Sequence, residues 1–332
     1  MSTYPQSYQA FYVEKTAEGF KRSVQSLNPE ALPQGEVLIE VHYSSLNYKD
    51  ALSASGNPGV TRNYPHTPGI DAAGVVLHSS NDRFQQGDEV IVTSYDLGMN
   101  TWGGFADLIR IPAAWVVPLP KGLSLKESMM LGTAGLTAAM SLEALLENGI
   151  TPEMGAVVVS GATGGVGSAA VALLAKAGFK VIASTGKANA HDMLKSIGAS
   201  EVINRDELNQ DEKRPMIKPR FAAAIDTVGG KTLETIIKSL NVNGAVAACG
   251  LVGGADLQLT VFPFILRGIR LLGIDSEKYS YAKRVALWQK LATGWKVDLS
   301  PINREIGLTE LEDAIAAILK GQIQGHVLVK VR

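Results

Sequence analysis

The feature that most constrains the fold is a glycine-rich turn between an apolar strand and an apolar helix. The turn reads GATGGVG over residues 161–167, with AVVVS before it and SAAVALLAKAG after it. Glycines at these spacings let the backbone turn sharply and let a pyrophosphate approach the first amides of a helix. A glycine triad alone is a weak signal, and the flanking strand and helix make it a predicted dinucleotide site. The alternative is a strand-to-helix turn that binds no ligand.

Apolar strands and helices alternate around this turn. We expect strands at 156–160, 180–184, 201–203, 221–226, 245–248 and 270–274, with helices at 166–177, 190–197 and 231–239. A helix over 124–148 precedes them, and a polar insertion occupies 205–219. Such alternation is typical of a parallel sheet with helices on both faces. The predicted class is therefore α/β, with a Rossmann-type doubly wound domain.

The first third of the chain has a different pattern. We expect strands at 36–43, 73–78, 89–93 and 106–117, separated by segments rich in glycine and proline. Short strands with such turns favour a barrel-like or sandwich domain. Helices at 281–293 and 310–320 and a strand at 326–331 are expected near the C-terminus. We predict a β-rich domain over 1–123, a Rossmann domain over 124–298, and a segment over 299–332 that returns to the first domain.

Composition excludes several classes of protein. Lys plus Arg number 31 and Asp plus Glu 32, giving a net charge of −1, so no basic surface for nucleic acid or an anionic membrane is indicated. Apolar runs such as residues 169–175 are much shorter than the roughly 20 residues that span a bilayer. Residues 1–10 are polar and do not resemble a secretory signal. We expect a cytoplasmic protein that binds neither nucleic acid nor membrane.

The residues after the second Rossmann strand indicate which dinucleotide binds. An NAD site usually has an acidic residue about 20 positions after the turn, to bond the ribose 2′-hydroxyl. This chain has Thr185, Gly186 and Lys187 there, and Arg205 follows the third strand. Hydroxyl groups and cations suit a 2′-phosphate. Each basic residue taken alone is more often a solvated surface charge, but together they predict NADPH.

Other chemically distinctive residues receive structural interpretations. Cys249 is the only cysteine, which excludes disulfides and any metal site that needs two thiolates. It is interpreted as a small buried hydrophobe and Asp226 as a structural hydrogen-bonding acid. The five histidines lack the spacing of metal ligands, and His66, between two prolines, is expected to be structural or cleft-lining. We predict no bound metal.

Four further motifs extend these observations: SLNYKD at 45–50, PGID at 68–71, GTAGLTA at 132–138 and PFILR at 263–267. With them, the whole chain resembles the medium-chain dehydrogenase/reductase superfamily, in particular the acryloyl-CoA reductase branch of its zinc-free quinone oxidoreductase group. The resemblance implies a GroES-like catalytic domain, NADPH-dependent reduction of acryloyl-CoA to propanoyl-CoA, and a homodimer.

The resemblance also implies which residues contact the cofactor. They are Tyr48, Thr163, Gly164, Gly165, Val166, Gly167, Thr185, Gly186, Lys187, Arg205, Leu251, Ile265 and Ser276. Some relatives in this branch have Ser-Gly-Arg where this chain has Thr-Gly-Lys at 185–187. Lysine keeps the positive charge but lacks the planar fork of arginine, so a weaker preference for NADPH is expected.

The reaction requires groups that stabilise an enolate and deliver a proton. Hydride addition to the β-carbon of an unsaturated thioester leaves negative charge on the carbonyl oxygen, which preorganised donors stabilise. Asn47, Tyr48 and Asp50 are the candidate catalytic residues, although Asp50 has an alternative role as a helix cap. An NADPH:quinone or enone reductase is the nearest alternative function. A non-catalytic NADPH-binding protein such as a redox sensor is another.

Overall fold

The computed structural model describes residues 5–210 and 213–332 and consists of two compact units. The first unit contains the chain up to Thr133, together with Ser276–Thr293 and Asn303–Arg332, and the second contains Ala134–Asp275 and Gly294–Ile302. The boundaries expected from the sequence, at 123/124 and 298/299, differ from these. Residues 1–4, from the polar N-terminal segment, and 211–212, from the polar insertion, lie outside the described residues.

The second unit is the Rossmann-type domain. Its six strands are all parallel and lie in the order β10-β9-β8-β11-β12-β13. Their bounds are β8 Val157–Val159, β9 Val181–Thr185, β10 Glu201–Asn204, β11 Phe221–Asp226, β12 Leu240–Ala248 and β13 Arg270–Gly273. Because the chain moves outward from β8 to β10 and then returns beside β8 as β11, the order reverses between β8 and β11. Ligands of such sheets bind at the carboxyl ends of the strands on either side of this point.

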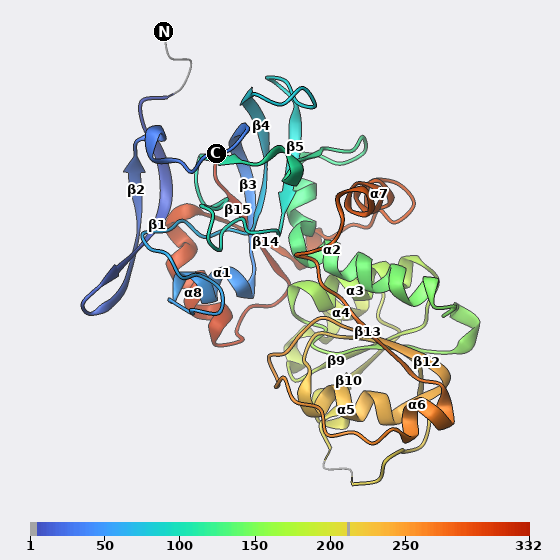
Figure 1. Ribbon diagram of the computed structural model, residues 1–332. Coiled ribbons are helices and arrows are strands. Elements are labelled where there is room, and N and C mark those ends of the chain that lie inside the picture. Colours follow the sequence, from blue (N-terminus) through green and yellow to red (C-terminus); the bar gives the residue numbers. More distant parts are fainter. Residues whose placement is uncertain (1–4, 211–212) are drawn as a thin grey trace. The chain divides into compact units, whose positions relative to one another are not determined.

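Helices cover both faces of this sheet (Figure 1). Helices α3 and α4 lie on one face and α5 and α6 on the other. Their bounds are α3 Gly165–Lys176, α4 His191–Ser196, α5 Gly230–Ser239 and α6 Phe262–Arg267. The sheet's interior is apolar because strands such as β9 and β11 are buried along their whole length, as parallel strands covered on both faces must be. The predicted α/β class and Rossmann-type sheet are confirmed.

The first unit is built on a seven-stranded sheet with the order β14-β15-β3-β4-β5-β7, in which β6 also pairs with β3. The strands are β3 Val37–Leu46, β4 Asp71–Ser79, β5 Glu89–Thr93, β6 Leu108–Ile111, β7 Val117–Pro118, β14 Asn303–Gly307 and β15 His326–Lys330. Helices α1 Tyr48–Ala54, α7 Tyr281–Ala292 and α8 Leu311–Leu319 belong to the same unit. Segments from both ends of the chain thus share one sheet, because β15 pairs antiparallel with β3.

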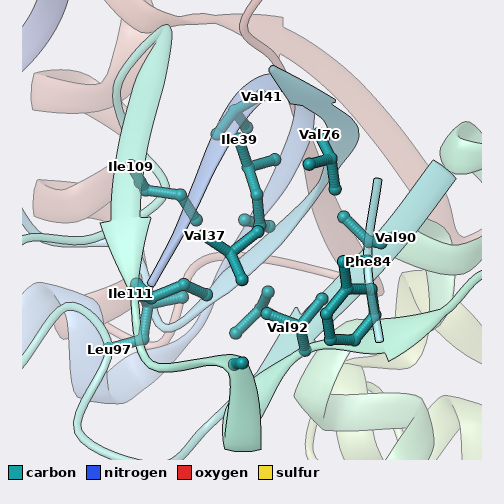
Figure 2. Close-up of a cluster of buried hydrophobic side chains, with 13 residues drawn as sticks. Val37, Ile39, Val41, Val76, Phe84, Val90, Val92, Leu97, Ile109 and Ile111 are labelled. Carbon is teal, nitrogen blue, oxygen red and sulfur yellow. The ribbon is translucent and has the colours of Figure 1, made fainter. Parts of the chain in front are cut away.

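The core of this sheet follows from a period of two in the sequence. Val37, Ile39 and Val41 alternate along β3 and point to one side, where they pack with valines of β5 and isoleucines of β6 (Figure 2). The expected strand over 106–117 is divided into β6 and β7 by a 3-10 turn at Ala113–Trp115. Helix α6, strand β14 and a hairpin of β1 Tyr8–Thr16 and β2 Gly19–Leu27 were not predicted. The hairpin gives a weak signal because β2 is only partly buried along its length.

Helix α2, Leu125–Glu147, carries the chain from the first unit into the second. It is kinked at Gly132, where φ is 52° and ψ is −157°. By length and composition it is apolar enough to cross a membrane, with a mean hydropathy of 1.4 over 18 residues, although the sequence predicted only short apolar runs. Since 78% of that stretch is buried within the protein, it has the burial of a core helix.

Candidate active site

The glycine turn joins β8 to α3 at the centre of the Rossmann sheet. Gly161 has a φ of +57°, and a Cβ there would lie 2.3 Å from the Thr227 hydroxyl. A Cβ on Gly167 would lie 2.3 Å from the Gly161 carbonyl oxygen, so the helix approaches the turn only because Gly167 lacks a side chain. Gly164 occupies the N-cap position of α3 without a side-chain cap. The first amides of α3 are therefore suited to an anionic group.

The residues predicted to read a 2′-phosphate lie together at the ends of neighbouring strands. Asn204 of β10 pairs with Thr185 of β9, which brings the following residue, Arg205, beside Gly186. A Cβ on Gly186 would lie 2.7 Å from Arg205 Nε and 3.0 Å from its Cζ, so the guanidinium packs on the bare glycine. Thr185 Oγ1 accepts a hydrogen bond from the Lys187 amide at 3.0 Å, and partial burial lowers the Lys187 pKa. The Arg205 guanidinium thus lies against Gly186, which Thr185 and Lys187 flank in the chain.

Asp226 supports the glycine turn through a hydrogen bond to the residue that precedes it. It is fully buried at the end of β11, accepts the Ser160 hydroxyl at 2.6 Å and accepts the Gly229 amide at 2.8 Å. Burial raises its pKa. Cys249 donates its thiol to the Asp226 carbonyl oxygen, and burial raises the thiol pKa to about 12. A thiol with such a pKa is a poor nucleophile, which agrees with a structural role. Cys249 is only partly buried, however, whereas a buried side chain was predicted.

Two predicted apolar cofactor contacts belong to the same unit. Leu251 follows β12 and Ile265 lies on α6, and both side chains are exposed. Arg267 fixes α6 by donating to the carbonyl oxygens of Lys238, Leu240 and Ile217. The Pro-Phe-Ile-Leu-Arg motif therefore combines an exposed apolar surface with an arginine that anchors it.

In the β-rich unit, the candidate catalytic residues surround the start of α1. Asp50 is fully buried, and its carboxylate accepts the amides of Asn47 at 2.7 Å, Ile70 at 2.8 Å and Gly69 at 3.2 Å. Burial, and then the nearby Asp71 charge, raise the Asp50 pKa to about 7. Asp50 therefore connects the N-terminus of α1 to the segment before β4. Tyr48, by contrast, is 42% exposed.

Asp71 is the centre of a polar cluster that sequence reasoning did not identify as a site. The cluster, called here the Asp71 cluster, comprises Ser45, Asn47, Asp50, Asp71 and Thr133. Asp71 accepts Ser45 Oγ at 2.6 Å, Asn47 Nδ2 at 2.8 Å, the Thr133 amide at 2.9 Å and Thr133 Oγ1 at 2.5 Å. Its carboxylate is thus surrounded by donors from two separate chain segments, residues 45–47 and Thr133. The available signal was a single acid opening the apolar strand β4.

The kink in α2 is part of this arrangement. A Cβ on Gly132 would lie 2.4 Å from Ser45 Oγ, 2.8 Å from Asp71 Oδ2 and 3.3 Å from His326 Nε2. The left-handed φ of Gly132 and its lack of a side chain let Thr133 turn both its amide and its hydroxyl toward Asp71. Gly132 is therefore required by the cluster rather than by the helix.

The His, Cys, Asp and Glu side chains of the described residues do not form a zinc site. Across residues 5–210 and 213–332, no group of three or more His, Cys, Asp or Glu side chains is placed to hold a metal ion. His66 is buried, with Nε2 2.9 Å from the Gly98 carbonyl oxygen, and burial lowers its pKa to about 4. It is a neutral, structural histidine rather than a cleft residue.

Comparison with known proteins identifies the family. Residues 33–121 match the alcohol dehydrogenase GroES-like domain, and residues 165–290 match the zinc-binding dehydrogenase family. A putative quinone oxidoreductase, YhfP of Bacillus subtilis (strain 168), is 46% identical over 97% of this chain and 98% of its own length. A probable acrylyl-CoA reductase, AcuI of Escherichia coli (strain K12), is 46% identical over 97% of this chain and 99% of its own. The chain belongs to the medium-chain dehydrogenase/reductase superfamily.

Solved structures of superfamily members match the whole chain. The yhdH oxidoreductase of Salmonella enterica, crystallised with NADP, has a TM-score of 0.95 at 45% identity and covers 98% of this chain and 100% of its own. Bacillus subtilis yhfP, crystallised with NAD, has a TM-score of 0.96 at 46% identity, with the same coverage. The predicted GroES-like domain and the superfamily are thereby confirmed. Relatives of equal similarity have been crystallised with different dinucleotides, so the residues of this chain must decide its own preference.

Proposed function

We propose that the protein is an NADPH-dependent reductase that converts acryloyl-CoA to propanoyl-CoA. The observation that carries this proposal is the packing of Arg205 on Gly186, between Thr185 and Lys187 in the chain, where an NAD site would present an acid. Relatives at 44–46% identity that are named acrylyl-CoA reductases support the substrate. The nearest alternative is an NADPH:quinone or enone oxidoreductase, which the name of YhfP favours.

We infer that the cofactor spans three groups of residues. Thr163, Gly164, Gly165, Val166 and Gly167 would hold the pyrophosphate, and Thr185, Gly186, Lys187 and Arg205 the 2′-phosphate. Leu251, Ile265, Ser276 and Tyr48 would contact the remainder of the cofactor. The glycine turn supports the first group because its helix amides lack a side-chain cap. NADPH, when bound, supplies the hydride.

The hydrogen bonds of Asn47 favour Tyr48 as the donor to the substrate. Asn47 Nδ2 donates to Asp71 at 2.8 Å and lies 3.3 Å from Asp50 Oδ2, so its two protons are directed into the Asp71 cluster. Its side chain can offer mainly an acceptor oxygen to a ligand. The exposed hydroxyl of Tyr48 is therefore the better donor for an enolate oxygen. We assign Asn47 and Asp50 to orienting this segment rather than to contacting the reacting atoms.

We also propose a cytoplasmic homodimer. Strand β13 is an edge of the Rossmann sheet, and exposed apolar side chains, Val261, Phe262, Ile265, Leu266 and Leu271, lie on it or just before it. An edge strand with apolar neighbours tends to pair with another strand, and a second copy of the same edge satisfies both. Leu271→Lys should produce monomers in sedimentation velocity, and a wild-type monomer at micromolar concentration would contradict the proposal.

The substrate is tested by comparing kcat/KM for acryloyl-CoA, crotonyl-CoA and a simple quinone with NADPH. Acryloyl-CoA should be favoured, and the extra methyl of crotonyl-CoA should cost about 10–200-fold if the pocket is small. A short acryloyl thioester without the nucleotide should lose kcat as well as KM, because remote binding energy orients the reacting carbon. A quinone that exceeds acryloyl-CoA tenfold would establish the alternative.

The cofactor preference is tested with Lys187→Glu. Replacing a cation that bonds the 2′-phosphate by an anion should reduce the NADPH-to-NADH ratio of kcat/KM by about 10–100-fold, since a charged hydrogen bond contributes about 1.5–3 kcal/mol. Lys176→Glu, on the exposed end of α3, serves as a control for the change in net charge. An unchanged ratio in Lys187→Glu would exclude this lysine from the phosphate site.

A further inference from the structure

The buried hydroxyl of Ser94 lies near two residues at which the chain passes from one unit to the other. The chain leaves the β-rich unit after Thr133 and returns to it at Ser276. Ser94 Oγ lies 2.9 Å from Thr133 Oγ1 and 3.4 Å from Ser276 Oγ. Ser94 is only 3% exposed. A single side chain just after β5 therefore contacts both crossing residues.

The backbone at Ser94 has an unusual conformation. Ser94 has a φ of 60° and Tyr95 a φ of 55°, so two consecutive non-glycine residues are left-handed. Such residues are uncommon, and each costs free energy that the surroundings must supply. The Ser94 amide donates to the Ile70 carbonyl oxygen at 2.8 Å, next to Asp71. The strained turn thus directs the Ser94 hydroxyl toward the segment that carries the Asp71 cluster.

Tyr95 and Arg284 hold this turn in place. The Tyr95 ring stacks on Trp115, with centroids 5.6 Å apart and planes 5° from parallel, and the Arg284 guanidinium carbon lies 4.3 Å from the Tyr95 ring centroid. Arg284 is fully buried; Nη1 donates to the Thr93 carbonyl oxygen at 3.0 Å and Nη2 to that of Ser276 at 2.7 Å. One arginine therefore joins the end of β5 to the segment that begins at Ser276.

We propose that Ser94 is a positioning residue that fixes Ser276 relative to the Asp71 cluster. The hydrogen-bonded path runs from Ser276 through Ser94 and Thr133 to Asp71, and from there to Asn47. All of these residues belong to the β-rich unit. The proposal rests on the proposed function, in which Ser276 contacts the cofactor and the Asp71 cluster orients the segment that carries Tyr48.

The test uses two substitutions and a matched control. Ser94→Ala removes the hydroxyl but keeps a side chain that disfavours the left-handed conformation. Ser94→Gly removes the hydroxyl and relieves that conformation, so it should fold even if Ser94→Ala does not. Ser128→Ala is the control: Ser128 is also fully buried in this unit, but its hydroxyl donates only to Leu125 of its own helix.

Three measurements separate positioning from general stability. Hydrogen–deuterium exchange of the full-length protein should accelerate at residues 130–136 and 273–279 in Ser94→Gly, with little change in Tm. The kcat should fall by about 10–100-fold, since small misplacements of reacting groups cost that much, while the Kd for NADPH rises by less than about 10-fold. The deuterium isotope effect on kcat from C4-deuterated NADPH should increase as hydride transfer becomes slower.

Two results would overturn the proposal: unchanged exchange at either crossing segment, or a kcat for Ser94→Gly equal to that of Ser128→Ala. The kinetic comparison uses whichever acceptor the wild type reduces best. If that acceptor is a quinone, the acryloyl-CoA function fails while the role of Ser94 is still tested. If the wild type reduces neither class, the exchange measurement alone decides.

Discussion

The glycine turn and the Asp71 cluster differ in how their residues are spaced along the chain and in what their hydrogen-bond donors contact. The turn is seven consecutive residues, and it leaves the amides at the start of α3 without a side-chain cap. The Asp71 cluster draws residues from three segments far apart in the chain and encloses one carboxylate in donors. A site that binds an anionic ligand leaves its hydrogen-bond donors available to that ligand. A cluster that contains a buried carboxylate of the protein uses its donors to bond that carboxylate.

This difference determines what a substitution does in each place. In the turn and at Gly186, the important quantity is space, because Gly167 and Gly186 accommodate a carbonyl oxygen and a guanidinium where a Cβ would lie. In the Asp71 cluster, the important quantity is hydrogen-bond polarity, because every group that hydrogen-bonds to the Asp71 carboxylate is a donor. Changes of volume should therefore damage binding in the Rossmann unit, and changes of polarity should damage folding in the β-rich unit.

The largest effect is expected from Asp71→Asn. The new amide would direct protons at donors that already point to Asp71, leaving at least two buried groups unsatisfied at about 1–3 kcal/mol each. The free energy of unfolding, measured by urea denaturation, should fall by about 4 kcal/mol. Asp88→Asn is the control, since Asp88 is in the same unit but accepts only the exposed Gln85 amide. Equal stability of the two variants would mean that polarity does not govern this cluster.

The next effect is expected from Gly167→Ala. The methyl group would meet the Gly161 carbonyl oxygen at 2.3 Å, so the turn must move away from the helix. NADPH affinity by fluorescence titration should fall about 100-fold, equivalent to about 2.7 kcal/mol. Gly294→Ala is the control, because Gly294 belongs to the same unit, lies outside the turn, and a Cβ there would meet nothing within 4 Å. If Gly294→Ala lost as much affinity, crowding of the turn would not explain the loss.

The same contrast explains what the sequence predicted. The turn, the strand β11 and the placement of Arg205 beside Gly186 were predictable because each depends on a few neighbouring residues or on the order of parallel strands. The parallel order itself brings Arg205 beside Gly186, through the pairing of Asn204 with Thr185. Local pattern and simple topology were sufficient there.

The Asp71 cluster was not predictable in this way. Its geometry depends on a kink at Gly132 inside an apparently continuous helix and on the antiparallel return of β15 beside β3. Neither leaves a periodic signal in the sequence. Asp50 and Asn47 were selected for their chemistry, but only the structure shows that their polar groups face Asp71 and the backbone rather than open space. Long-range pairing decides such sites, and single-sequence patterns do not encode it.

The smallest effect concerns two buried titratable groups of the β-rich unit whose ionisation changes the unfolding free energy with pH in opposite directions. The Asp50 pKa rises from 3.8 to about 7 on folding, mainly through burial, so the unfolded chain releases this proton first as pH increases. Its contribution to stability is complete below pH 3.8 and is lost as pH rises through 7. The His66 pKa falls from 6.5 to about 4, again through burial, so its contribution is complete above pH 6.5 and is lost as pH falls through 4.

Between pH 4 and 6.5 the two slopes should nearly cancel in the wild type, since each is at most about 1.4 kcal/mol per pH unit. Asp50→Asn removes the first slope, so the unfolding free energy of this variant should increase more steeply with pH over that range than the wild type. His66→Gln, whose amide can still donate to the Gly98 carbonyl oxygen, removes the second and should make the slope more negative. Urea denaturation at half-unit pH intervals measures both. A slope that is the same in Asp50→Asn as in the wild type would mean that Asp50 is ionised in the folded protein throughout this range, and that its donors outweigh its burial.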